Sequence, residues 1–130
     1  MLVVKRLLLK LLMLLALLSL FGCQMIGQRD RGLEYVPGGD ADRGQETFVE
    51  YGCGSCHIIP DVPGANSTVG PPLIKWADRV YIVGTLPNMP ENLVYWLQYP
   101  QEVEPDSAML HLAVTEQDAR DMSAYLYTLR

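Results

Sequence analysis

The chain has 130 residues, with ten basic side chains, fifteen acidic side chains and a net charge of −5 at neutral pH. A chain of this length forms one small domain, which can bury only a limited apolar area. The acidic balance argues against binding to nucleic acid, because that binding depends on clustered lysine and arginine side chains.

Residues 1–22 have the charge order of a secretory signal peptide. Three basic residues precede an almost wholly apolar stretch at residues 11–21, which is shorter than the roughly 20 residues of a membrane span. The sequence Leu20-Phe21-Gly22-Cys23 then resembles a bacterial lipobox, which predicts cleavage before Cys23 and a lipid on that cysteine. An uncleaved membrane anchor is the alternative. In either case we expect an exported, periplasm-facing protein that is attached to a membrane.

Residues 23–39 are predicted to be the lipidated cysteine and a flexible tether. The stretch is rich in glycine and polar residues, shows no apolar period and ends in Pro37-Gly38-Gly39. The alternative is that its apolar residues, Leu33, Tyr35 and Val36, pack on the domain. Gln24 replaces the aspartate that retains some bacterial lipoproteins at the inner membrane, so it favours the outer membrane and leaves the inner one open. Without residues 1–22, the chain has seven basic and fifteen acidic residues, a net charge of −8.

Three helices are predicted in the remaining residues, 40–130, and no alternating strand pattern is visible, so we expect an all-α domain. The first helix runs from about Ala41 to Tyr51, with Asp40 as its N-cap and Gly52 at its stop position. The second begins near Pro90 and stops before Pro100. Their apolar faces are predicted to contain Gly44, Phe48 and Tyr51 in the first helix, and Leu93, Trp96 and Leu97 in the second.

The third helix has the clearest start, because Thr115 is a good N-cap and Asp118 occupies the reciprocal capping position. Its acidic first turn suits the positive end of the helix dipole. Its buried face is predicted to contain Ala119, Met122, Tyr125, Leu126 and Leu129.

The sequence Cys53-Gly54-Ser55-Cys56-His57 follows the first helix and carries the clearest chemical signal of the chain. C-x-x-C-H is the attachment motif of c-type haem, in which two thiols form thioethers and the histidine ligates the iron. Thiol oxidoreductases and zinc sites also use C-x-x-C. A thioredoxin-like site would need a strand–helix–strand pattern around the motif, and none is visible. With Cys23 taking lipid, the three cysteines are accounted for.

Residues 40–130 resemble a class I cytochrome c. They show a Gly-x-x-x-Phe helix, C-x-x-C-H, Gly70-Pro71-Pro72-Leu73, a methionine and a final helix with an aromatic residue, in the order of that family. The resemblance implies an all-α cytochrome c fold with three main helices around one covalently bound haem c. It also implies that Gly44 and Phe48 cross the last helix near Met122 and Tyr125. From Gly70 onward, the sequence is similar to the cytochrome domains associated with haem–copper oxidases, including those fused to oxidase subunit II.

The resemblance also implies roles for individual residues. His57 would ligate the iron, the carbonyl of Pro71 would accept a hydrogen bond from its ring, and Leu73 would pack on the haem face. Haem propionates need donors, for which Trp76 and Arg79 are the best candidates, with Tyr81 and Trp96 as further ones. The alternative for Arg79 is an ion pair with Asp78 or a solvated side chain.

The second iron ligand is predicted to be Met109, which lies where the family places its axial methionine. Leu110 follows it, whereas the family has proline there. Met89, which precedes Pro90, and His111 are the other candidates, and a haem without a second protein ligand is also open.

A haem iron held by His57 and Met109 has no open position, so the resemblance implies an electron carrier rather than an enzyme, without a small-molecule substrate. The expected function is transfer of single electrons between redox proteins, to or within a terminal oxidase chain and with a haem–copper oxidase as a possible partner. Two other hypotheses are a haem sensor or enzyme-like protein with an open sixth position, and a fixed subunit of a larger redox complex. Ile58, Ile59 and Val62 could form the apolar centre of a docking patch, or simply pack within their loop.

Overall fold

The structure is a computed structural model that describes residues 4–10, 13 and 36–130. Residues 4–10 are helical, and none of the described helices is long and apolar enough to cross a membrane. Residues 14–35 lie outside the described residues. They include the predicted cleavage site, Cys23, Gln24 and most of the predicted tether.

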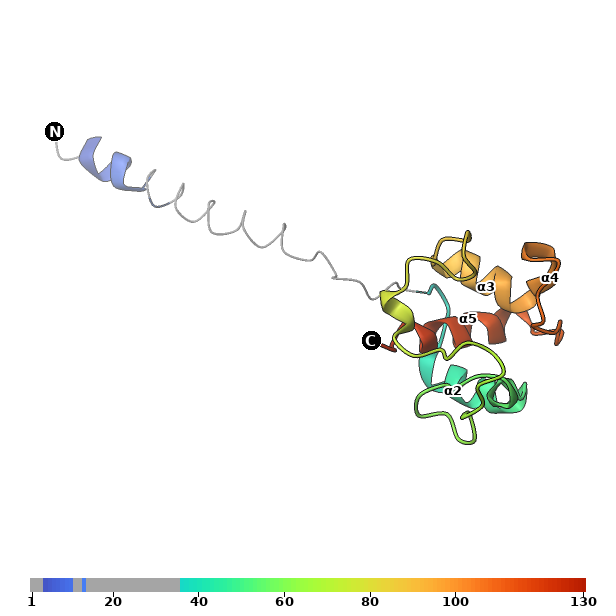
Figure 1. Cartoon of the computed structure of the whole chain (residues 1–130). Coiled ribbons are helices and arrows are strands. Elements are labelled where there is room, and N and C mark those ends of the chain that lie inside the picture. The colour runs from blue at the N-terminus through green and yellow to red at the C-terminus, as the bar shows by residue number, and fades with distance from the viewer. Residues whose placement is uncertain (1–3, 11–12, 14–35) are drawn as a thin grey trace. The chain divides into compact units, whose positions relative to one another are not determined.

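Residues 36–130 form a helical unit in which α5 lies between α2 on one side and α3 on the other (Figure 1). The described part of the chain contains no strand and only two isolated β-bridges, so the prediction of a helical domain is confirmed for these residues. The elements in chain order are α2 (Ala41–Glu50), the short 3₁₀ turns η1 (Cys53–Ser55) and η2 (Trp76–Asp78), α3 (Pro90–Gln98), α4 (Pro100–Val103) and α5 (Glu116–Leu126).

The ends of α2 follow the predicted capping residues. The carboxylate of Asp40 accepts hydrogen bonds from the backbone N–H groups of Asp42, at 3.0 Å, and Arg43, at 3.2 Å. Gly52 stops the helix with a φ of 68°, a left-handed conformation that glycine adopts at little cost. This turn leads directly into η1, so the end of α2 positions the cysteine motif.

The start of α5 differs from prediction in one contact. The Thr115 hydroxyl accepts a hydrogen bond from the Asp118 N–H at 3.2 Å, as expected of an N-cap. The reciprocal bond is replaced, because the Thr115 N–H donates to the Tyr51 hydroxyl at 3.4 Å. The Asp118 carboxylate instead accepts from the hydroxyls of Thr115, at 2.7 Å, and Tyr51, at 2.9 Å. A residue from the end of α2 therefore completes the cap of α5.

The crossing of α2 and α5 is close enough to require glycine at position 44. A Cβ atom on Gly44 would lie 2.0 Å from the backbone oxygen of Asp121 and 2.9 Å from the backbone nitrogen of Met122. One turn further along α2, the rings of Phe48 and Tyr125 pack with their centroids 5.9 Å apart. The predicted contact between the first and last helices is confirmed.

The predicted second helix corresponds to α3, which begins at Pro90 and buries Leu93, Trp96 and Leu97 in the core. The predicted stop before Pro100 is confirmed, but Pro100 also opens the four-residue helix α4, which the sequence analysis did not predict. Pro100 can begin this helix because the first helical position needs no N–H donor.

The last residues of the predicted tether contact the helical unit. The side chain of Val36 is buried in the core. The side chains of Gln117 and Arg120 in α5 donate hydrogen bonds to the carbonyls of Gly38, at 2.8 Å, and Pro37, at 3.1 Å. The packing alternative therefore holds for Val36, and α5 fixes the chain from this residue onward.

Candidate functional site

The cysteine motif lies on a tight turn that brings its residues close together. Cys53 begins η1, and its carbonyl accepts hydrogen bonds from the N–H groups of Cys56, at 3.2 Å, and His57, at 3.0 Å. Cys53 is half-buried and Cys56 is exposed, and both are free thiols. Burial raises the pKa of the Cys53 thiol to about 11, so this thiol is protonated at neutral pH.

The ring of His57 is held by the segment that begins at Gly70. Its Nδ1 atom lies 2.7 Å from the carbonyl oxygen of Pro71, the acceptor that the sequence analysis expected. With Nδ1 as the donor, Nε2 is left with its lone pair free to ligate a metal. A Cβ atom on Gly70 would lie 2.6 Å from the His57 Cε1 atom and 2.9 Å from its Nδ1 atom. Only glycine lets the chain pass this close to the imidazole.

Two backbone hydrogen bonds fasten this segment to the cysteine motif. The Gly70 N–H donates to the Cys56 carbonyl at 2.7 Å, and the Leu73 N–H donates to the Ile58 carbonyl at 2.8 Å. Leu73 itself is buried in the core. The structure therefore brings together the motif, Pro71 and Leu73, which are separated by up to 20 residues in the sequence.

Trp76 and Arg79 form a second group of predicted site residues, one turn further along the chain. The Arg79 guanidinium lies over the Trp76 ring, 4.6 Å from its centroid, and donates to the carbonyls of Pro72 and Ile74. Within residues 36–130, it pairs with no carboxylate, so the ion pair with Asp78 that we considered is not formed. Burial lowers the pKa of Arg79 below its usual value, but a guanidinium stays charged at neutral pH.

The indole nitrogen of Trp76 is a buried donor with no partner among the described residues. An unpaired buried donor costs roughly 1–3 kcal/mol, so such groups are rare and call for an explanation. Trp76 Nε1 and the stacked Arg79 guanidinium are together suited to a carboxylate of a bound group.

Asn88 binds the backbone of both Trp76 and Arg79, a role that no sequence pattern predicted. Its side chain is 8% exposed, and its Nδ2 atom donates to the backbone carbonyls of Trp76, at 3.0 Å, and Arg79, at 3.1 Å. Its Oδ1 atom accepts from the hydroxyl of Tyr127 at 3.0 Å. A polar residue flanked by Pro87 and Met89 gave no local signal, because its partners lie 9 to 39 residues away.

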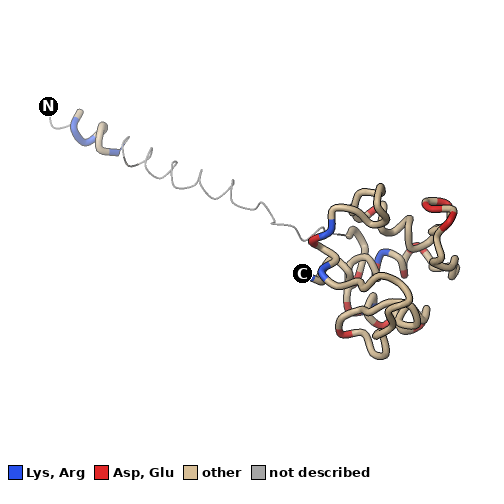
Figure 2. The backbone as a smooth tube through the Cα atoms, in the orientation of Figure 1, with Lys and Arg blue, Asp and Glu red and all other residues tan. Residues whose placement is uncertain are grey.

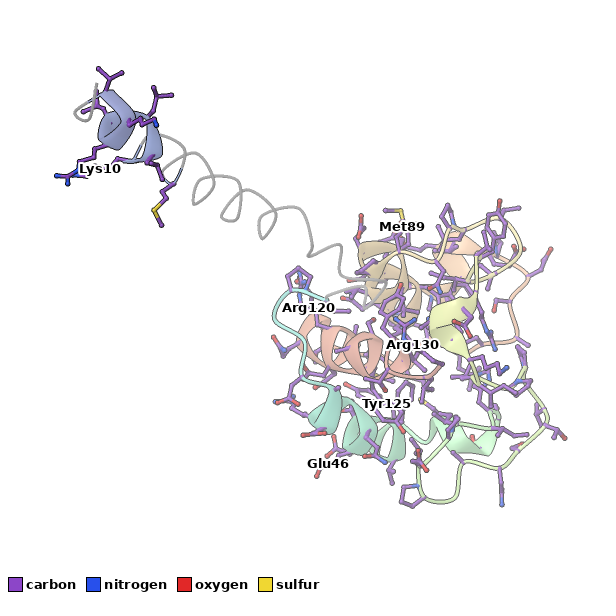
Figure 3. The ribbon with its side chains drawn as sticks, turned by 90° about the vertical axis from the view of Figure 1, so that its left-hand side faces the viewer. Lys10, Glu46, Met89, Arg120, Tyr125 and Arg130 are labelled. Carbon is purple, nitrogen blue, oxygen red and sulfur yellow. The ribbon has the colours of Figure 1, made fainter. Side chains whose placement is uncertain are left out.

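The three candidates for a second iron ligand lie in different environments. Met109 is half-buried against the core, and its backbone is held by a bond from its N–H to the Ser107 hydroxyl and by one from the Gln101 side chain to its carbonyl. Met89 is 45% exposed and projects from the edge of the domain (Figure 3). His111 is exposed, with its ring 6.1 Å from that of Tyr99. Of the three side chains, only that of Met109 packs against the core.

Other expected roles are not matched by the local environment. Ile59 and Val62 are buried in the core and cannot form a docking patch, whereas Ile58 is half-buried. The apolar residues that are exposed near the motif are instead Val69 and Ile74. Trp96 is buried in the core and Tyr81 is half-exposed, and neither contacts the Trp76–Arg79 pair through a described hydrogen bond.

These residues fit a haem in their donor chemistry. The site offers two thiols, an imidazole with a fixed tautomer, a half-buried thioether, and an indole and a guanidinium suited to a carboxylate. Within the described residues, no group of three or more His, Cys, Asp or Glu side chains could hold a lone metal ion. A zinc site is therefore not supported there.

Comparison with known proteins finds relatives of a single kind. The chain is 32% identical over 91 residues to cytochrome c oxidase subunit 2 of Alkalihalophilus pseudofirmus, covering 69% of this chain and 26% of that protein. It is 27% identical over 89 residues to cytochrome c oxidase subunit 2 of Bacillus subtilis, covering 67% of this chain and 25% of that protein. No family model and no solved structure matches the chain. The chain thus spans about a quarter of the length of these relatives, and about two thirds of it is similar to them.

Proposed function

We propose that this protein is a membrane-anchored, mono-haem c-type cytochrome that carries single electrons in a terminal oxidase chain. The observation that carries the proposal is the contact between His57 Nδ1 and the Pro71 carbonyl, with Gly70 packed against the ring. This contact lies directly beside the C-x-x-C-H turn, and it prepares Nε2 to ligate a haem iron.

The chain's own residues would then have defined tasks. The thiols of Cys53 and Cys56 would each add S–H across a vinyl double bond, so two thioethers form and nothing is released. Met109 would offer a thioether sulfur as the second iron ligand, which favours the reduced state relative to a second histidine. Trp76 and Arg79 would donate to a haem carboxylate. A bound haem supplies reversible one-electron chemistry, and this ligand pair leaves no position for a small-molecule substrate.

The high pKa of Cys53 argues against the competing role of a thiol oxidoreductase. Reactive C-x-x-C sites lower the pKa of the attacking thiol, because the thiolate is the nucleophile. Burial shifts the pKa of Cys53 in the opposite direction, to about 11. Cys53 therefore lacks the property that an attacking thiol needs at neutral pH.

The place of the protein in an oxidase chain rests on its similarity to cytochrome c oxidase subunit 2 of two bacteria. We propose that it exchanges electrons with other redox proteins, including a haem–copper oxidase, while a lipid at Cys23 keeps it at the membrane. Nucleic acid is not a proposed partner. The same similarity supports a second candidate, a fixed subunit of an oxidase complex. Solubilisation in mild detergent separates the two, because a fixed subunit co-purifies with its complex and a carrier is recovered alone.

Carbon monoxide tests the carrier against a haem sensor or an enzyme with an open iron position. If His57 and Met109 both ligate the iron, the reduced carrier should bind carbon monoxide slowly and incompletely. Rapid and complete binding by the wild-type protein would contradict the proposed ligand pair.

A further inference from the structure

We propose that Asn88 is a positioning residue that holds Trp76 and Arg79 in the orientation needed to bind a haem carboxylate. This inference rests on the proposed function, since it concerns how that site is built. No motif in the sequence points to Asn88, and it lies before α3, outside the segment that carries the site.

The side chain of Asn88 is fully used in this role. Its Nδ2 atom donates to the carbonyls of Trp76, at 3.0 Å, and Arg79, at 3.1 Å, while its Oδ1 atom accepts from the Tyr127 hydroxyl at 3.0 Å. An amide has two donor hydrogens, and here both go to main-chain oxygens three residues apart. The backbone at both ends of η2 is therefore fixed by one buried side chain.

The backbone of Asn88 adds to the same connection. Its N–H donates to the carbonyl of Val80 at 2.9 Å, so residues 76–80 are held from two directions. On the far side of η2, the Ala77 N–H donates to the Leu129 carbonyl at 3.0 Å. The turn is thus fastened to the segment before α3 and to the chain after α5.

The fixed backbone of η2 determines where the side chains of Trp76 and Arg79 lie. The Trp76 indole nitrogen is buried without a partner, and the Arg79 guanidinium stacks on the Trp76 ring without a carboxylate partner in residues 36–130. The buried indole donor is costly unless a bound group accepts from it, and the half-buried guanidinium beside it suits an anion as that group. A turn that can shift would lose the alignment of the two donors, and Asn88 prevents that shift.

A double-mutant cycle on the reduction potential tests the proposal. In the wild-type background, R79M should lower the potential, because removing a positive charge near a haem carboxylate favours the oxidised state. In the N88L background the turn that carries Arg79 loses two hydrogen bonds to its main-chain carbonyls, so R79M should shift the potential at least twofold less. N92L is the matched control: Asn92 makes one described hydrogen bond, to the Pro87 carbonyl at 3.0 Å. R79M should have its full effect in that background.

The outcomes separate this inference from the proposed function. If the wild-type protein carries no covalent haem, the proposed function fails. If it carries haem but R79M shifts the potential equally in the wild-type, N92L and N88L backgrounds, Asn88 has only a structural role and the inference is wrong. A potential that R79M does not change in the wild-type background overturns it as well.

Should N88L fail to fold, Y127F replaces it in the cycle. This change removes the hydroxyl that orients the Asn88 amide, so the amide can turn away from the carbonyls of Trp76 and Arg79 and the R79M shift should shrink, by a smaller factor than in N88L. A full R79M shift in Y127F would then count against the inference. Thermal unfolding of each variant is measured in parallel. A loss of stability alone leaves the effect of R79M on the reduction potential unchanged, so a smaller R79M effect reports the loss of positioning.

Discussion

At the scale of single residues, the site depends on how closely a backbone passes an imidazole. Gly70 lies against the ring of His57, and the next residue supplies the carbonyl that fixes the histidine tautomer. His57, Gly70 and Pro71 therefore act as one unit, although Gly70 lies 13 positions after His57 in the sequence. A change at Gly70 should be felt at His57 before it is felt elsewhere.

The first prediction concerns Gly70→Ala. The added methyl carbon would lie 2.6 Å from His57 Cε1, so the ring or the 70–73 segment must move. We expect a loss of more than about 2 kcal/mol in the free energy of unfolding and a marked fall in covalent haem per protein. Gly64→Ala is the control, because its methyl group meets open space and only the φ of 76° is strained, at about 1 kcal/mol. Equal haem content in the two variants would contradict the role given to Gly70.

The second prediction separates the candidate iron ligands. Met109→Ala should remove the absorption band near the red edge of the visible spectrum that reports an iron–thioether bond, and should make the reduced protein bind carbon monoxide rapidly. Met89→Ala is the matched control, since the same side chain is removed from an exposed position at the start of α3. If the band survives in Met109→Ala and disappears in Met89→Ala, the ligand assignment is wrong.

At the scale of secondary-structure elements, the crossing of α2 and α5 fixes where the site begins. Gly44 allows the two helices to touch, and α2 ends at the glycine turn that leads into the cysteine motif. Beside the crossing, the Arg43 side chain forms ion pairs with Asp118, at 2.6 Å, and with Asp121, at 2.9 Å. Asp121 is fully buried and also accepts from the Asp40 N–H at 2.9 Å, so α5 helps to place the start of α2.

The third prediction concerns Gly44→Ala at this crossing. A methyl group 2.0 Å from the Asp121 backbone oxygen forces the helices apart, because no flexible side chain can move aside. We expect a loss of roughly 2–3 kcal/mol in the free energy of unfolding, measured by urea denaturation. Glu46→Ala, at an exposed position of the same helix, should change it by less than about 0.5 kcal/mol (Figure 3). Similar values for both variants would rule out a tight crossing.

The fourth prediction concerns the pH dependence of stability. Hydrogen bonding to Thr115, together with Arg43 and Tyr51, holds the pKa of Asp118 below its usual value. A carboxylate with a lowered pKa stabilises the fold above the unfolded-state pKa of about 3.9 and loses this contribution as the pH falls through its folded-state pKa. Asp118→Asn should therefore be less stable than the wild type at pH 7, with a difference that shrinks below about pH 4.

Urea denaturation at neutral and acidic pH checks this prediction. Glu46→Gln is the control for removing an acidic side chain from α2, and its difference from the wild type should not follow the same course. An Asp118→Asn difference that stays constant down to pH 2 would show that the charge of Asp118 does not contribute.

The sequence predicted those elements whose signals are local. Asp40, Gly52, Pro90 and Thr115 mark helix ends through their own backbone chemistry, and the structure places them there. The tautomer-fixing Pro71 carbonyl was expected from the family resemblance rather than from any local rule. Asn88 was missed because its partners are distant main-chain atoms, and α4 was missed because a proline was taken only as a stop signal. Long-range contacts leave no trace in the spacing of neighbouring residues.

Across the whole molecule, the described helical unit carries many more acidic than basic residues, and the acidic positions are distributed along its chain (Figure 2). From residue 80 to residue 119 the sequence contains no lysine or arginine. Such a surface repels nucleic acid and attracts basic partners over a range of about 10 Å at ordinary salt. The charge distribution agrees with a protein that meets other proteins briefly at its surface.

The proposed covalent attachment of haem depends on the five residues from Cys53 to His57. The turn of η1 carries the half-buried thiol of Cys53 and leads to His57, whose ring is held by the Pro71 carbonyl. The proposed attachment of haem requires this arrangement. The similarity to cytochrome c oxidase subunit 2 of two bacteria agrees with a redox role.

The intact mass of the purified protein, produced in a host that matures c-type cytochromes, tests this claim most directly. We predict a mass that exceeds the polypeptide by one haem, and a protein with both Cys53→Ala and Cys56→Ala that lacks this addition. A wild-type mass without haem, or one that shows only a disulfide between Cys53 and Cys56, would contradict the account.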